Sequence, residues 1–203
     1  MLDEKDKWCP DKWCPFYGYL MIPILVVVKG VKTWGQANML GFAMPSIQSE
    51  LDLTRGVIST IFGLSTLIGA ILQTPLGHLV DTHGSRLVMT MMLAVVSSGM
   101  LMLAYCTGPI GLFFSFLILR SAFVVDTATD ACLTQWFKRK RGRVGSVYQF
   151  LAISIGGTGA VSLTQYWIFE VGWRGAWIRA ALVTLLSAIP AWLIIRHTPE
   201  EEI

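Results

Sequence analysis

The sequence predicts an all-α membrane protein with six transmembrane helices and both termini in the cytoplasm. Of its 203 residues, 54% are hydrophobic and only 14% are charged, whereas soluble domains carry about 25% charged residues. The mean hydropathy is +0.58. The apolar residues form long runs, and the lysines and arginines gather in alternate connections between those runs. These observations indicate that most of the chain is surrounded by lipid.

Six apolar segments are long enough to supply the roughly 20 residues that a transmembrane helix needs. They are predicted at about Phe16–Pro45, Ile58–Val80, Leu87–Cys106, Ile110–Trp136, Val144–Ile168 and Gly175–Ile195. The short connections between them contain turn-forming or charged residues. We therefore expect a cytoplasmic segment at residues 1–15, a six-helix domain at 16–196 and a cytoplasmic tail at 197–203. The first run lacks a small-residue cleavage site behind it, so we expect it to remain as the first helix.

The distribution of basic residues sets the predicted orientation. With the N-terminus in the cytoplasm, ten lysines and arginines fall on the cytoplasmic side, and only Arg55 and Arg174 fall outside. The ten are Lys5, Lys7, Lys12, Arg86, Lys138, Arg139, Lys140, Arg141, Arg143 and Arg196. Cytoplasmic loops of membrane proteins carry such an excess, so both termini are predicted to be cytoplasmic.

Several other classes of protein fit the sequence poorly. The net charge of +3 is small and follows the topology, so a nucleic-acid partner is not expected. Cys9 and Cys14 repeat within a duplicated Asp-Lys-Trp-Cys-Pro, but no second ligand pair lies at the spacing of a metal site. No segment combines a nucleophile with a base. We expect neither enzymatic activity nor a cofactor.

Charged residues inside the first and fourth predicted spans are the candidate solute-binding residues: Lys29, Lys32, Arg120, Asp126 and Asp130. Each costs roughly 2.5–3.5 kcal/mol at the bilayer centre, so such residues usually have a function. The two lysines are three residues apart and the two aspartates four apart, so each pair shares one helix face. A rise of about 1.5 Å per residue places Lys29 nearly level with Asp126, and Lys32 level with Arg120.

From this placement we hypothesise that Lys29 pairs with Asp126, while Lys32 and Arg120 bind an anionic solute, because a guanidinium suits a carboxylate. Two other interpretations stay open. Arg120 could bond backbone carbonyls in a structural role, and the lysines could extend along the helix to reach water.

The connection after the second span reads Gly77-His-Leu-Val-Asp81-Thr-His-Gly84-Ser-Arg86. Its spacing and position resemble the signature loop of the major facilitator superfamily of transporters. The entry at Phe16–Tyr19, the pairs Trp136-Phe137 and Arg141-Gly142, the sequence Gly172-Trp173-Arg174 and the tail Arg196–Glu200 are similar to its monocarboxylate and oxalate–formate branch. The resemblance covers nearly the whole chain.

This resemblance implies secondary transport of a small solute by alternating access, with an organic anion such as a monocarboxylate as the solute and the plasma membrane as the default location. It also implies that Gly77, Asp81, Gly84 and Arg86 form a conformational motif, in which the glycines permit close approach and Asp81 and Arg86 act as a gating latch. Family members have about twelve spans in two halves, so we expect this chain to need a second half, which could be an identical copy, a separate chain or the remainder of a longer chain. The alternative is a non-transporting fragment, scaffold or regulatory half. The glycine-rich 156–159 stretch lacks the Gly-Pro pair of the antiporter pattern, so antiport is not inferred.

Overall fold

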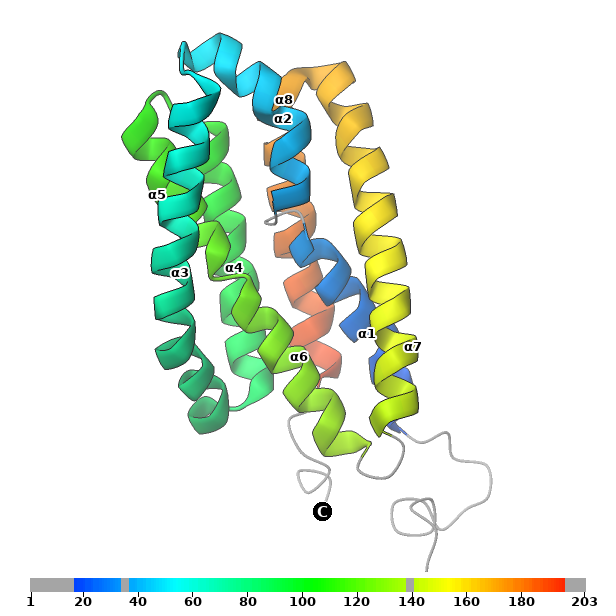
Figure 1. The fold of residues 1–203 in the computed structure, drawn as a ribbon. Coiled ribbons are helices and arrows are strands. Elements are labelled where there is room, and N and C mark those ends of the chain that lie inside the picture. The colour runs from blue at the N-terminus through cyan, green and yellow to red at the C-terminus, as the bar shows by residue number, and fades with distance from the viewer. Residues whose placement is uncertain (1–16, 34–36, 138–140, 196–203) are drawn as a thin grey trace, which may run out of the picture.

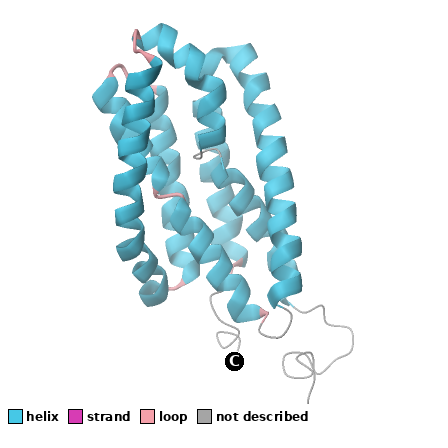
Figure 2. Ribbon diagram, viewed as in Figure 1, coloured by secondary structure: helices cyan, strands magenta, loops and turns pink. Residues whose placement is uncertain are grey.

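The protein is a bundle of helices. The computed structural model describes residues 17–33, 37–137 and 141–195, and the regular structure within these ranges is helical throughout (Figure 2). The predicted segments at 1–15 and 197–203 lie outside the described residues. The all-α prediction is confirmed for the part of the chain that the structure describes.

The helices run nearly parallel to one long axis (Figure 1). In chain order they are α1 (Tyr17–Lys32), α2 (Ala37–Leu51), α3 (Arg55–His83), α4 (Ser85–Ala104), α5 (Pro109–Arg120), α6 (Phe123–Trp136), α7 (Arg141–Ile153), the π-helical segment η2 (Ser154–Gly159) and α8 (Ala160–Ile194).

Four helical segments are long and apolar enough to cross a membrane. They are Arg55–Val80, Ser85–Ala104, Pro109–Gln135 and Gly142–Ile194. The last has 53 residues, which would extend about 80 Å as one straight helix, far more than a bilayer core of about 30 Å. It turns back at Gly172, whose φ of 78° and ψ of 170° are not helical. The yellow and orange limbs of Figure 1 meet at this bend.

The first predicted span contains two described helices, α1 and α2, which have 16 and 15 residues. Residues 34–36 between them lie outside the described residues. Thr33, just after α1, donates its hydroxyl to the carbonyl of Gly30 at 2.6 Å, and such local bonds compete with helix continuation. Within the fourth span, Ser121 and Ala122 form a turn between α5 and α6, but both keep helical backbone angles, and Pro109–Gln135 remains one apolar segment long enough to cross a membrane. The count of six spans and the cytoplasmic position of the termini stay predictions.

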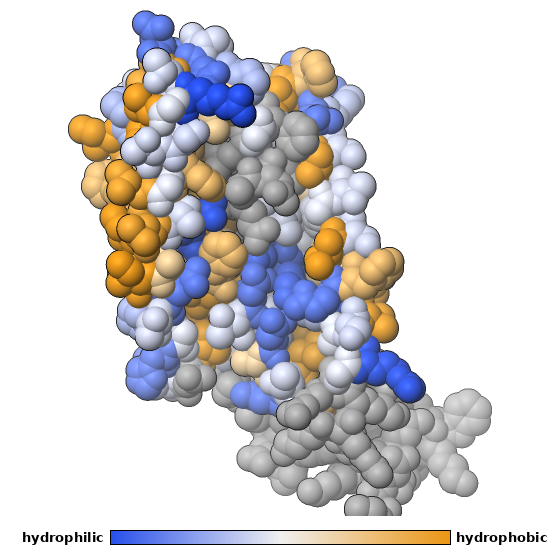
Figure 3. Space-filling view, viewed as in Figure 1, coloured by the Kyte–Doolittle hydropathy of each residue, from blue (hydrophilic) through white to orange (hydrophobic). Residues whose placement is uncertain are grey.

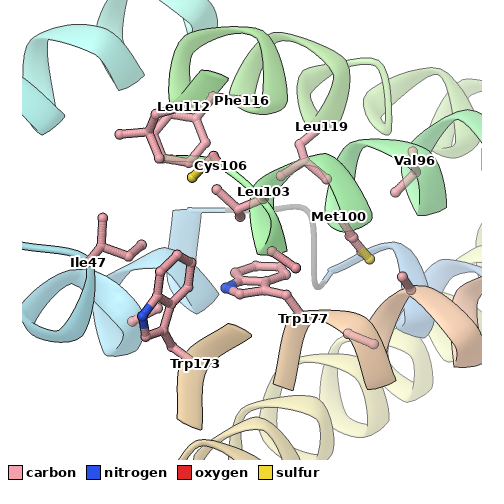
Figure 4. Packing of buried hydrophobic residues seen from close by; sticks show 14 of the residues in the cluster. Ile47, Val96, Met100, Leu103, Cys106, Leu112, Phe116, Leu119, Trp173 and Trp177 are labelled. Carbon is pink, nitrogen blue, oxygen red and sulfur yellow. The ribbon is translucent and has the colours of Figure 1, made fainter. Parts of the chain in front are cut away.

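Buried apolar side chains form two clusters, one toward each end of the bundle. Figure 4 shows the cluster at the upper end of Figure 1, where Trp173 and Trp177 of α8 face Phe116 of α5 and Leu103 of α4. The second cluster, which includes Met21, Val88, Leu93, Val125 and Ile195, fills the end where α1 begins and α8 ends. Burial of apolar surface and close packing hold these helices together.

A polar clamp closes the upper end. Arg174 donates from Nε to Glu50 Oε1 at 2.7 Å and from Nη1 and Nη2 to the carbonyls of Ala104 and Cys106 at 2.6 and 3.0 Å. Trp173 also donates from its indole nitrogen to Glu50. The clamp therefore joins the last turn of α2, the end of α4 and the bend of α8. Cations at a helix C-terminus also interact favourably with the helix dipole.

We expect the clamp to make stability depend on pH in the acid range. The hydrogen bonds from Arg174 and Trp173 hold the pKa of Glu50 below its usual value. A carboxyl group whose pKa is lowered by folding stabilises the protein above its unfolded pKa, near 4.5, and loses this effect as the pH falls through the folded value. The melting temperature of Glu50→Gln should lie below that of the wild type at pH 7, and the two should converge as the pH falls below about 4. A constant difference across this range would contradict the assignment.

Candidate functional site

The two lysines of α1 meet the two aspartates of α6 inside the bundle. Lys29 Nζ lies 3.2 Å from Asp130 Oδ1 and 3.6 Å from Asp126 Oδ1. Lys32 Nζ pairs with Asp126 Oδ2. The expected sharing of one helix face brings all four charges together, and these four residues are called the ion cluster below.

The pairing differs from the hypothesis in one respect. Lys29 does contact Asp126, but Lys32 does so as well, so the charge of Lys32 is neutralised in this arrangement. The reason is geometric. Lys29 and Lys32 are about one helical turn apart on one face of α1, and the two carboxylate oxygens of Asp126 lie within reach of both lysines. The ion cluster is electrically balanced, with two cations and two anions. The binding of an anionic solute by Lys32 and Arg120 stays a prediction.

The ion cluster lies between the two apolar clusters. On α1, Val28 belongs to one apolar cluster and Val31 to the other. Lys29 and Lys32 follow these two valines, so they lie where the two apolar clusters meet. Lys32 is almost fully buried, with its side chain 2% exposed, whereas the Asp130 side chain is 49% exposed. In Figure 3, hydrophilic residues gather in the middle of the face between α3 and α7, with apolar residues to either side. The ion cluster therefore opens toward one face of the bundle.

Aromatic rings flank the cations. Lys29 Nζ lies 5.0 Å from the ring centroid of Tyr148 on α7, and Lys32 Nζ lies 5.3 Å from that of Phe123 on α6. Arg120 lies 5.7 Å from the same Phe123 ring. Such contacts favour a desolvated cation. Tyr148 and Phe123 are not among the site residues predicted from the sequence. Phe123 is three residues from both Arg120 and Asp126, and residues at this spacing share a helix face. This spacing is the feature of the sequence that could have placed Phe123 at the site.

Arg120 differs from the lysines because its charge is not neutralised nearby. It is 5% exposed, and its guanidinium lies 4.5 Å from the ring of Phe62 on α3. Among the side chains that the structure describes, Arg120 has no ion-pair partner, and its buried Nε and Nη2 have no hydrogen-bond partner. Gly69 of α3 lets the helices approach here, because a Cβ at Gly69 would lie 2.6 Å from Arg120 Cβ.

The four residues of the signature loop have separate surroundings. Gly84 joins α3 to α4 with a φ of 83° and a ψ of 148°, a conformation that is essentially restricted to glycine. Gly77 lies within α3, and a Cβ there would meet nothing within 4 Å. The expected close helix approach at Gly77 is therefore not found within the described part of the chain. The guanidinium of Arg86 lies 4.5 Å from the ring of Trp192. The side chain of Asp81 lies outside what the structure describes, so its pairing with Arg86 stays a prediction.

Residues 33–203 match the sequence description of the Major Facilitator Superfamily. The chain belongs to the Major Facilitator Superfamily. The match covers Asp126 and Asp130 of the ion cluster but not Lys29 or Lys32, and it covers all of the signature loop, so the resemblance noted from the motif residues is confirmed at the level of the family. The finer assignment to the monocarboxylate and oxalate–formate branch stays a prediction.

Three bacterial proteins are similar in sequence. They are "Uncharacterized transporter YybO" of Bacillus subtilis (27% identical over 75% of this chain and 35% of the relative), "Putative metabolite transport protein" of Haemophilus influenzae (30% over 81% and 40%) and "Probable L-galactonate transporter" of Escherichia coli (24% over 89% and 40%). The chain thus spans 35–40% of the length of these relatives.

The ion cluster gives a prediction about stability. Removing one partner of a buried ion pair costs about 3–5 kcal/mol, because the other charge is left uncompensated. Lys32→Met should lower the free energy of unfolding in mixed micelles by about that amount. Lys32→Met combined with Asp126→Asn should recover most of the loss, because Lys29 keeps Asp130 at 3.2 Å. If the double variant were as unstable as the single one, the assigned pairing would be wrong.

The signature loop supplies a matched pair of glycine substitutions. Gly84→Ala should lower the free energy of unfolding by about 1–3 kcal/mol, because alanine is strained at a positive φ. Gly77→Ala should leave it unchanged or raise it by about 0.5–1 kcal/mol, because alanine favours the helix. Thermal unfolding of both variants in the same detergent measures the difference. Equal losses would contradict the assigned roles of the two glycines.

Proposed function

We propose that this chain is the N-terminal half of a secondary transporter that carries a small organic anion by alternating access, together with a second six-helix half. The observation that carries the proposal is the buried, unneutralised guanidinium of Arg120 beside a balanced ion cluster. Lys29, Lys32, Asp126, Asp130 and Arg120 form the proposed solute site.

The sign of the solute follows from the charges. The ion cluster contributes no net charge, so Arg120 is the surplus cation at this level of the bundle. Two of its buried nitrogens lack partners among the described side chains, and leaving such donors unsatisfied costs about 1–3 kcal/mol or more. A carboxylate accepts two parallel bonds from a guanidinium. An anionic solute would therefore satisfy both the charge and the donors.

The exposure of the ion cluster supports a second half. The side chain of Asp130 is 49% exposed and that of Asp126 is 25% exposed. If this face contacted lipid, a carboxylate would lie in hydrocarbon, which is costly. A second bundle packed on this face would enclose the ion cluster in a water-accessible cavity. The relatives' greater length agrees with such a half, whether it is part of a longer chain, a separate chain or a second copy.

The names of the relatives agree with the proposed transport function. All three names refer to transport, and the name of the Escherichia coli relative refers to L-galactonate, which is a carboxylate. In the same proposal, Asp81 and Arg86 act as a conformational latch against the second half. The plasma membrane is the proposed location.

The proposal is tested by ligand-induced stabilisation of the protein in lipid nanodiscs. L-galactonate and lactate should raise the melting temperature of the wild type, as a ligand of the folded state does. The neutral sugar L-galactose should not. Arg120→Gln should weaken anion binding by roughly 10–100-fold, the cost of losing hydrogen bonds between charged groups.

Arg179→Gln is the matched control, since Arg179 is already paired with Glu170 at 3.0 Å. This variant should bind like the wild type. Equal binding by Arg120→Gln would overturn the assignment of Arg120. If the wild type bound neither anion, alone or with a second half, the non-transporting alternative would be favoured.

A further inference from the structure

One helix contact behind the solute site is closer than any side chain allows. A Cβ built on Gly156 of η2 would lie 2.4 Å from Gly30 Cα and 2.9 Å from the Gly30 carbonyl oxygen. Both atoms belong to the backbone of α1, so an added methyl group would force the two helices apart. The backbones of α1 and η2 therefore touch at this point.

The contact is confined to one glycine of the glycine-rich stretch. A Cβ at Gly157 would meet only Ile153 Cγ2 of its own helix, at 3.9 Å, and one at Gly159 would meet nothing within 4 Å. Beside the contact, α1 and α8 separate around an apolar groove of about 250 Å³, lined in part by Val27 and Leu163. Of these three glycines, Gly156 alone lies against the backbone of α1.

A hydrogen bond marks the same point. The hydroxyl of Thr33 lies 3.0 Å from the carbonyl oxygen of Gly156, as well as 2.6 Å from that of Gly30. A π-helical turn shifts the regular pattern of backbone bonds, and such turns often occur at functional sites. The end of α1 is therefore joined to η2 by both a backbone contact and a side-chain bond.

The contact and the ion cluster lie on different sides of α1. Successive residues of a helix are about 100° apart, so Lys32 lies about 160° around the helix from Gly30. One side of α1 rests on η2 at Gly156, and the opposite side presents Lys32 to Asp126 of α6. Any displacement of α1 by η2 would move both lysines relative to the aspartates.

We propose that Gly156 is a positioning residue of the solute site. By admitting the backbone of Gly30, it sets the distance of Lys29 and Lys32 from Asp126 and Asp130, and the bond from Thr33 fixes that position. Motion of the α7–η2–α8 limb would reach the ion cluster through this contact. The inference concerns the site named above and so rests on the proposed function for its role in transport.

The test is a spectroscopic measurement that needs no solute. Lys29 Nζ lies 5.0 Å from the Tyr148 ring, so the ¹⁹F resonance of fluorotyrosine at Tyr148, assigned with Tyr148→Phe, reports the position of Lys29. Gly156→Ala should move this resonance toward its position in Lys29→Met. Gly157→Ala, which adds the same methyl group to the same segment, should leave it in place. An unmoved resonance in a folded Gly156→Ala protein would overturn the proposal.

Thr33 supplies a second pair of variants in case Gly156→Ala does not fold. Thr33→Val removes the hydroxyl and should shift the resonance in the same direction, whereas Thr33→Ser keeps the hydroxyl and should restore the wild-type position. Identical spectra for the two variants would contradict the role of the bond.

Binding of L-galactonate separates this inference from the proposed function. If the shifts occur but the wild type binds no anion, Gly156 positions the ion cluster and the proposed function fails. If the wild type binds and Gly156→Ala shifts neither the resonance nor the affinity, the positioning role alone fails.

Discussion

The ion cluster is the constraint on which the arrangement of the bundle depends. Charged groups in an apolar interior are tolerated only when they are paired, and Lys29, Lys32, Asp126 and Asp130 come from helices about 100 residues apart in the sequence. Their pairing requires α1 and α6 to lie side by side at one level and in one rotational setting. The apolar clusters on either side would permit other settings of these helices, because hydrophobic packing is not directional.

The surroundings of the ion cluster preserve that setting. Gly156 supports α1 from behind, while Gly69 admits Arg120 against α3. At the upper end, Arg174 ties α2, α4 and α8 together through hydrogen bonds to charged or carbonyl groups. The structure thus combines a balanced polar centre with small residues at the close helix contacts, as is common where helices pack in membranes.

Membership of the Major Facilitator Superfamily and the exposure of Asp126 and Asp130 both support the proposed second half. A half bundle that presents carboxylates on one face has a surface unsuited to lipid. The relatives are long enough to cover that face within one chain. In the proposed transporter, Arg120 meets the solute while the ion cluster keeps the remaining charges neutral.

The sequence by itself determined the helical membrane class, the family, and the residues of the ion cluster. These follow from features that are local in the chain: long apolar runs, the spacing from Gly77 to Arg86, and charges three or four residues apart. Only the tertiary structure decided that Lys32 is paired with Asp126 and that Arg120 has no ion-pair partner among the described side chains. It also showed that, of the three glycines in 156–159, Gly156 is the one that contacts the backbone of α1. The physical reason is that these properties depend on how two helices are rotated and set against each other, which the residue pattern of either helix does not determine.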